Sequence, residues 1–163
     1  MNDLFPKEAQ DVLSMAEFLE IPGFDMMQGI LEGIYPAAPI SKILNYNVRA
    51  VEKGKVVFRG TPNLESRNPM GSIHGGWYGT ILDSAMACAV MTTLPAGKIQ
   101  TTLEFKVNII SPIPAGVTVD AVGTVEHSGK STGVAVGSLF DIKTGKLYAS
   151  SSTTCIIMAP KLK

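Results

Sequence analysis

Hydrophobic positions change their spacing along this chain of 163 residues. In the first forty residues they recur at helical intervals, which predicts one helix that Pro6 opens and that ends before Ile21. A second, short helix is expected to end before Pro36. Residues 1–40 are therefore expected to form an N-terminal helical extension on the main body, with two apolar sets: Ala9, Val12, Leu13, Ala16 and Leu19, then Met26, Met27, Ile30, Leu31 and Ile34.

Beyond this segment the spacing becomes that of strands. Residues 41–51 and 56–60 predict a hairpin around a turn at 52–55, and further strands are expected at 99–109, 117–126, 134–142 and 147–158. Strands that return through such short turns indicate an antiparallel meander. Within 99–109 one face is predicted to be buried, because an apolar row alternates with a polar one: Ile99, Thr101, Leu103, Phe105, Val107 and Ile109 against Gln100, Thr102, Glu104, Lys106 and Asn108.

A further helix is expected over residues 76–92, between the first hairpin and the later strands. It is apolar nearly all round, so it should be buried on most sides. The expected architecture is α+β, with an antiparallel sheet wrapped around this long central helix. Asp83 does not fit that burial, because it is the one charged residue between Arg67 and Lys98. An unpaired buried carboxylate is costly, so Asp83 is either a hydrogen-bonded structural group or part of an active site.

The segment that leads into this helix is the second unusual feature. Residues 68–76 place a histidine and two glycines where free backbone N–H groups point outward. Such donors, with the helix dipole, can hold an oxyanion or a polarised carbonyl, although a plain glycine-rich turn has the same composition. Gly75 and Asp83 lie about 12 Å apart along one helix. If they cooperate on one carbonyl, the carboxylate must come from a second subunit, which predicts a homodimer.

Composition excludes several classes of protein. Fourteen basic residues balance fourteen acidic ones, which leaves no electrostatic footprint for nucleic acid. No stretch is apolar for the length of a membrane helix, and the N-terminus lacks the pattern of a signal peptide. Cys88 and Cys155 each lie in an apolar stretch and are expected to be buried thiols in a reducing compartment. A cytoplasmic protein without a membrane partner is the expectation.

Taken in order along the chain, Asp83 and the motif that precedes it at residues 68–76 resemble the sequence pattern of the hotdog-fold acyl-CoA thioesterases of the phenylacetic-acid-degradation type. The resemblance covers about residues 42 to 158 and includes a strand at 101–105 and turns at 111–112 and 127–130. It implies a hotdog domain over residues 41–163, joined to the N-terminal extension in a single globular unit. Relatives of this type also imply a homodimer that pairs into a homotetramer. The motif residues that carry the resemblance are Asn68, Gly71, His74, Gly75, Gly76 and Asp83.

The resemblance implies a role for each site residue. Asp83 would act as general base toward water or as nucleophile, and the Gly75 N–H would polarise the thioester carbonyl. Asn68 would hold the attacking water or the carbonyl, while His74 shapes the start of the helix. Thr102 would touch the water or the thioester region. The implied reaction converts an acyl- or aryl-CoA to free acid and coenzyme A without a metal or added cofactor, and the residues implied in substrate binding are Gly76, Gly129 and Lys130.

Four alternatives compete with this interpretation. A hotdog hydratase or dehydratase uses a histidine and an acidic residue in different local motifs, and a non-catalytic acyl-CoA sensor does not need a buried Asp83. A Ser-His-Asp hydrolase built on Ser72 would need a Gly-x-Ser-x-Gly elbow, which the sequence lacks. The acyl group, and the choice between coenzyme A and acyl carrier protein, stay open. A metal site would have to draw on residues that are not at ligand spacing: His74, His127, Cys88 and Cys155.

Overall fold

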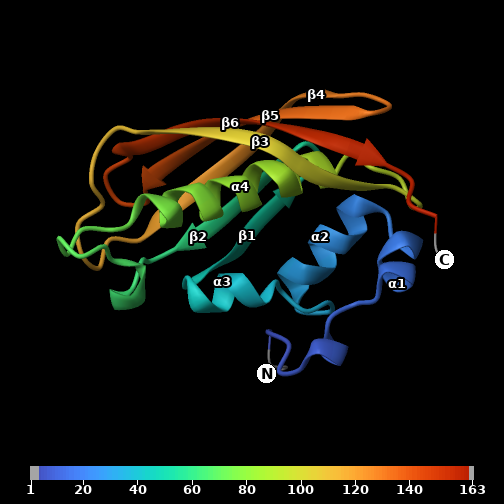
Figure 1. Cartoon of the computed structure of the whole chain (residues 1–163), viewed down its shortest axis with the longest axis horizontal. Coiled ribbons are helices and arrows are strands. Elements are labelled where there is room, and N and C mark those ends of the chain that lie inside the picture. Colours follow the sequence, from blue (N-terminus) through green and yellow to red (C-terminus); the bar gives the residue numbers. More distant parts are fainter. Residues whose placement is uncertain (1–3, 162–163) are drawn as a thin grey trace.

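Six antiparallel strands and one long helix make up the body of the molecule (Figure 1). The computed structural model describes residues 4–161. The sheet curls around helix α4 (Gly75–Met91), which confirms the expected α+β architecture. The strands are β1 (Tyr46–Glu52), β2 (Lys55–Gly60), β3 (Ile99–Ile109), β4 (Val119–Ser128), β5 (Thr132–Asp141) and β6 (Leu147–Met158).

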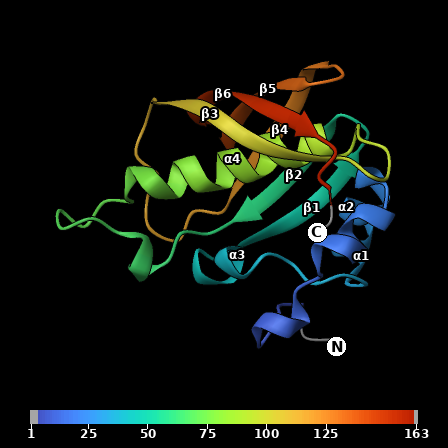
Figure 2. The same cartoon turned by 45° about the vertical axis from the view of Figure 1, so that its right-hand side comes forward.

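The strand order departs from the predicted meander. The sheet runs β1-β2-β4-β5-β6-β3, so β3 pairs with β6 and not with β4. Because α4 comes between β2 and β3 in the sequence, the chain crosses the concave side of the sheet before it enters the sheet again. Figure 2 shows β3 beside β6, across α4 from β1. The two edges of the sheet are therefore β1 and β3.

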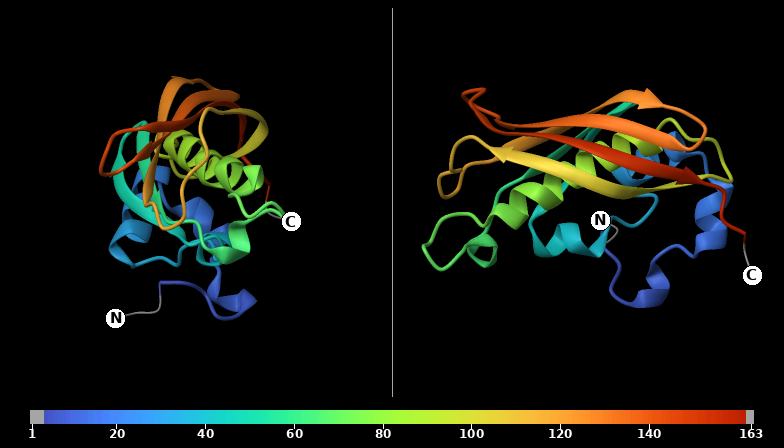
Figure 3. Two further views of the ribbon diagram at one scale, coloured as in Figure 1. Left: turned by 90° about the vertical axis from the view of Figure 1, so that its left-hand side faces the viewer. Right: turned by 45° about the horizontal axis from the view of Figure 1, so that its top comes forward.

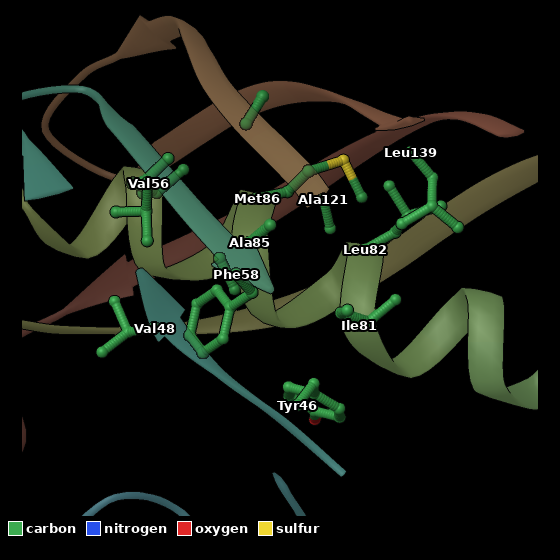
Figure 4. Close-up of a cluster of buried hydrophobic side chains, with 14 of the residues drawn as sticks. Tyr46, Val48, Val56, Phe58, Ile81, Leu82, Ala85, Met86, Ala121 and Leu139 are labelled. Atoms are coloured by element: carbon green, nitrogen blue, oxygen red, sulfur yellow. The ribbon is translucent and has the colours of Figure 1, made fainter. Parts of the chain in front are cut away.

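The inner face of the sheet and α4 share one hydrophobic core. Eleven of the 17 residues of α4 are buried, as its apolar sequence predicts. Glycines in the sheet let the helix approach closely: a Cβ added at Gly123 on β4 would lie 2.2 Å from the backbone oxygen of Ala85. The core side chains shown in Figure 4 come from β1, β2, α4, β4 and β5, and include Tyr46, Val56, Phe58, Ile81, Leu82, Ala85, Met86, Ala121 and Leu139.

The beginning of the chain does not form the single helix that its apolar spacing predicts. A 3₁₀ turn, η1 (Ala9–Asp11), is followed by extended backbone at Val12 and then by the short helix α1 (Met15–Glu20). Ser14 caps α1 in a capping box, in which its Oγ accepts a hydrogen bond from the N–H of Glu17. The prediction is wrong here because this cap starts a new helix inside the apolar pattern.

The rest of the N-terminal segment is also helical. Helix α2 (Gly23–Glu32) confirms the second predicted helix and ends at Gly33, whose φ of 74° is left-handed. The strand expected from residue 41 begins only at Tyr46, because α3 (Pro39–Ile43) precedes it with proline in its first turn. The domain boundary predicted at residues 40/41 falls within α3 and stays a prediction.

Backbone hydrogen bonds join the N-terminal helices to the loop between α4 and β3. The N–H of Gly23 donates to the carbonyl of Leu94 at 3.0 Å, and the N–H of Gly97 donates to the carbonyl of Leu19 at 2.7 Å. From this attachment α2 runs beside β1 and also contacts α4, and α3 contacts β1 (Figure 3). The N-terminal helices thus cover part of α4 on the side that the sheet leaves open.

Candidate functional site

Asp83 lies on α4 opposite the edge strand β3 and is half-buried. Its Oδ1 accepts a hydrogen bond of 2.8 Å from the Thr102 hydroxyl on β3. Burial raises the pKa of the half-buried Asp83, and the hydrogen bond from Thr102 lowers it by less than burial raises it. A carboxylate with a raised pKa and a fixed orientation is suited to take a proton from water.

Thr102 reaches Asp83 because of a β-bulge in β3. The pairing with β6 shifts between Thr102 and Glu104, which leaves Leu103 as the extra residue. The alternation in the sequence predicts Thr102 and Phe105 on opposite faces, but both point toward α4: a Cβ at Gly79 would lie 3.2 Å from the Phe105 ring. The prediction of one buried face is wrong for this strand, since Leu103 is 59% and Phe105 44% exposed.

His74 builds the start of α4. It is the N-cap residue, and its Nδ1 accepts a hydrogen bond of 2.9 Å from the N–H of Gly76. The N–H of Gly75 donates to no group within residues 4–161. A Cβ at Gly75 would lie 3.3 Å from Ile109, so this donor sits beside β3. Both Gly75 and Gly76 were expected to contact the substrate. The N–H of Gly75 is available to an oxyanion, whereas the N–H of Gly76 donates to the capping side chain of His74.

The loop between the 3₁₀ turn η2 (Leu64–Ser66) and α4 is held together by Asn68. The Asn68 Nδ2 donates to the Ser72 hydroxyl at 2.8 Å, and its Oδ1 accepts from the N–H of Met70 at 3.0 Å. This side chain therefore shapes the loop on the Gly75 side of α4. The structure does not bring Asn68 to Asp83 of the same chain, which lies further along the helix.

Gly129 and Lys130, expected beside coenzyme A, lie at the other end of α4. They belong to the turn between β4 and β5, which is fixed to the helix end by a 2.7 Å hydrogen bond between the Thr93 and Ser128 hydroxyls. The N–H of Gly129 donates to the carbonyl of Thr132 within this turn. Because α4 is about 25 Å long, the site residues of one chain fall into three separate places: the start, the middle and the far end of the helix.

A polar row beside Asp83 escaped the sequence analysis. The Ser84 hydroxyl donates to the carbonyl of Thr80 at 2.9 Å, so the Tyr46 hydroxyl is the donor in its 3.0 Å bond to Ser84. Thr80, Asp83, Ser84 and Cys88 are spaced three and four apart, which is the signal that could have revealed this helix face. It was missed because the small and apolar residues between them make the helix look buried all round.

The two cysteines are free, as the sequence predicts. Cys155 is buried as predicted, while Cys88, five residues after Asp83 on α4, is only half-buried. Burial raises the pKa of Cys88 to about 12, and the nearby charge of Asp83 contributes to the shift. The thiolate form is therefore disfavoured, and Cys88 is not a candidate nucleophile.

The two histidines lie far apart, at the start of α4 and at the β4–β5 turn. Within residues 4–161, no group of three or more His, Cys, Asp or Glu side chains could hold a metal ion. That part of the chain also contains no helix with the length and hydropathy needed to span a membrane. A reaction without metal or cofactor stays a prediction.

The region from the loop before α4 to β6 matches a known family. The model of the thioesterase superfamily matches residues 70–148. Acyl-coenzyme A thioesterase 13 of Mus musculus is 26% identical over 142 residues, which cover 86% of this chain and 89% of that protein.

Solved structures show the same fold. A phenylacetic acid degradation-related protein from Ralstonia eutropha JMP134 is 28% identical with a TM-score of 0.72, over 80% of this chain and 98% of that one. The PaaI protein of the E. coli phenylacetic acid degradation operon is 21% identical with a TM-score of 0.73, over 89% of this chain and 99% of that one. The matched region, the curated relative and the shared fold together support a hotdog-fold thioesterase of the phenylacetic-acid-degradation type.

Proposed function

We propose that this chain hydrolyses the thioester bond of an acyl- or aryl-CoA to the free acid and coenzyme A. The observation that carries the proposal is the half-buried Asp83 carboxylate, which Thr102 of the edge strand β3 holds beside a helix whose start presents the Gly75 N–H. The mouse relative named acyl-coenzyme A thioesterase 13 supports coenzyme A as the carrier. The cytoplasm is the compartment we propose for the reaction.

In the proposed reaction, Asp83 takes a proton from a water molecule while the water oxygen attacks the thioester carbonyl carbon. The carbonyl oxygen becomes negatively charged and accepts a hydrogen bond from the N–H of Gly75, aided by the positive end of α4. The C–S bond then breaks, and the leaving thiolate takes the proton that Asp83 holds. Thr102 orients the carboxylate throughout. Direct attack by Asp83, followed by hydrolysis of an anhydride, is the alternative route.

Two chains are needed to complete this site. Gly75 and Asp83 of one chain lie about 12 Å apart, whereas a reacting carbonyl needs both groups within about 3 Å. The β3 edge supports a second copy, because an exposed apolar edge strand is a surface for strand pairing. Four large side chains on or next to this edge are 44 to 59% exposed: Leu103, Phe105, Ile109 and Ile110.

Pairing along β3 would also bring the correct groups together. Thr102 and its partner Asp83 lie toward one end of the strand, while Gly75 lies beside Ile109 at the other end. A two-fold axis through an antiparallel β3–β3 contact exchanges these ends, so each carboxylate faces the helix start of the other subunit. Two equivalent sites per homodimer result. The pairing of dimers into a homotetramer stays a prediction.

Complementation between two inactive variants tests the shared site. Asp83→Asn removes the base, and Gly75→Pro removes the donor N–H at a first helical position where proline is well tolerated. His74, with φ −63° and ψ 138°, already has the backbone conformation required before proline. After refolding of a mixture, heterodimers contain one undamaged site and one doubly damaged site. Activity is expected to recover to about a quarter of the wild-type rate, if exchange is random.

Each variant refolded alone is the control and should stay inactive. Subunit exchange is verified independently with mass-tagged chains. If exchange occurs and no activity returns, the site is built within one chain, and the shared-site proposal is wrong.

The function itself is tested with a panel of acyl-CoA thioesters, from acetyl- to palmitoyl-CoA and including phenylacetyl-CoA. Release of the free thiol is followed over time in the presence of a chelator, because the proposed chemistry uses only water, a carboxylate and a backbone donor. Steady turnover of at least one thioester is expected. Binding of coenzyme A without turnover of any thioester in the panel would instead favour a non-catalytic acyl-CoA sensor. Hydrolysis of acyl groups on acyl carrier protein alone would show that acyl carrier protein, and not coenzyme A, is the carrier.

The pH dependence reports on the Thr102–Asp83 hydrogen bond. Since the pKa of Asp83 is raised, kcat/KM is expected to fall on acidification at a higher pH than a free aspartate would give. Thr102→Val removes the interaction that lowers this pKa, so the acidic limb should move to still higher pH. The measurement is kcat/KM against pH for both proteins. Thr101→Val, on the exposed neighbouring residue, is the matched control, and superimposable profiles of Thr102→Val and wild type would contradict the role of Thr102.

A further inference from the structure

A cavity of about 190 Å³ lies between the N-terminal helices and the body of the fold. Its walls come from two sources that are remote in sequence. Residues of α2 and the start of α3 form one side, among them Met27, Ile30 and Ala38. The opposite side belongs to β1, β2 and α4 and includes Tyr46, Phe58 and Met91. We propose that this cavity binds the hydrocarbon tail of the acyl group and limits its length, an inference that rests on the proposed function.

The cavity reaches the turns of α4 that follow the carboxylate of the site, and Asp83 itself is not part of its lining. Ser84, the next residue after Asp83, lines it, and so does Cys88 one turn further along α4. Tyr46 joins the two regions, since it lines the cavity and donates its hydroxyl to Ser84. Burial raises the pKa of both Tyr46 and Cys88, and the charge of Asp83 adds to both shifts, so the carboxylate is within electrostatic reach of the lining. A thioester held at Asp83 can therefore extend its tail into the cavity.

The lining favours an unsubstituted hydrocarbon. Its hydroxyl groups already have partners within the protein: Ser41 donates to the carbonyl of Ala38 at 2.7 Å, and Tyr46 and Ser84 are bonded as described. The side-chain oxygen of Asn47 accepts from the N–H of Val48. No charged side chain within residues 4–161 lines the cavity, so an acyl group with a buried charge would lose its hydration without gaining a charged partner, which is unfavourable. A saturated tail loses nothing and gains contact with methionine and phenylalanine side chains.

The volume limits the length of that tail. A cavity of about 190 Å³ has room for about six groups the size of a water molecule, which occupies about 30 Å³ in the liquid. A methylene group is of similar size. Acyl groups near octanoyl should therefore fill the cavity, and much longer ones should not fit.

Methyl NMR of the methionines detects occupancy directly. Met27 and Met91 line the cavity, whereas Met70 and Met158 are exposed elsewhere. Sodium octanoate, titrated into the protein labelled at its methionine methyl groups, is expected to shift the Met27 and Met91 signals and to leave those of Met70 and Met158 in place. Shifts at the exposed methionines without shifts at the two lining ones would overturn the proposal, as would no shift at all.

Two substitutions then test the control of chain length. Ile30→Ala enlarges the cavity and should move the preferred acyl chain upward by about two carbons. Ala38→Leu fills part of it and should lower kcat/KM for octanoyl-CoA at least about tenfold relative to butyryl-CoA. The matched controls are Ile34→Ala and Ala16→Leu, at exposed N-terminal positions outside the cavity lining, and both should keep the wild-type profile.

The outcomes separate this proposal from the proposed function. If the wild type hydrolyses acyl-CoA and the cavity variants keep its chain-length profile, the cavity does not bind the tail. If the wild type hydrolyses none of the thioesters, the proposed function fails, and the octanoate titration still decides whether the cavity takes a hydrocarbon.

Discussion

Asp83→Asn is expected to lower kcat/KM by a factor of about 10² or more, with the fold intact. Asparagine has nearly the shape of aspartate, and its side-chain oxygen can still accept the hydrogen bond from Thr102. It cannot take a proton from water, so the attacking group loses its base. The measurement is kcat/KM for the best thioester of the panel, above the acidic limb of the pH profile.

Stability gives this variant an internal control. Because the folded state raises the pKa of Asp83, folding favours the protonated form, and the ionised carboxylate lowers stability at a pH above that pKa. Asp83→Asn should therefore melt at a temperature no lower than that of the wild type in this range. Asp25→Asn, an exposed acidic residue of α2, serves as the matched substitution with unchanged turnover. If Asp83→Asn hydrolysed thioesters at the wild-type rate, Asp83 would not be the base or nucleophile of the reaction.

Gly123→Ala is expected to destabilise the fold by about 3 kcal/mol. The added Cβ would lie 2.2 Å from the backbone oxygen of Ala85 and 2.6 Å from the backbone nitrogen of Met86. Neither backbone atom can rotate away, so α4 has to move off β4 and lose packing along its length. Chemical denaturation gives the free energy of unfolding from the midpoint and the slope.

Gly129→Ala is the matched glycine substitution on the same hairpin. Its Cβ would lie 2.8 Å from Nε2 of His127, at the end of a side chain that can turn aside. A much smaller loss of stability is expected there. Equal midpoints for the two variants would show that α4 does not sit against β4 as closely as the structure has it.

The sequence predicted those parts of the molecule that local chemistry determines. The strand hairpins follow from their turn residues, and α4 follows from its apolar run and from the segment ending in His74, Gly75 and Gly76. Asp83 stood out because no other charge lies near it in the sequence. Each of these signals is contained within a few consecutive residues, where backbone preference and burial act together.

The features that the sequence did not predict depend on contacts between distant segments. No pattern within β3 shows that it pairs with β6, because pairing is decided by how the chain crosses α4. Strict alternation along β3 assigns Thr102 to the polar face, and only the bulge at Leu103 explains why its hydroxyl meets Asp83. The family resemblance had nevertheless identified Thr102 as a site residue. The size and the lining of the cavity could not be predicted either, since its walls meet only after α2, β1, β2 and α4 have packed.

The attachment of the N-terminal helices through the backbone has a consequence for how such proteins diverge. The N–H groups of Gly23 and Gly97 bond to carbonyls across the junction, and these bonds do not depend on the side chains of the helices. The exposed side chains of α1 and α2 can therefore change between descendants of one ancestor without undocking the segment, whereas Gly23, Met26 and Met27 are fixed by their burial. Lineages that keep the same carboxylate and helix start are free to explore different ligands through this segment alone.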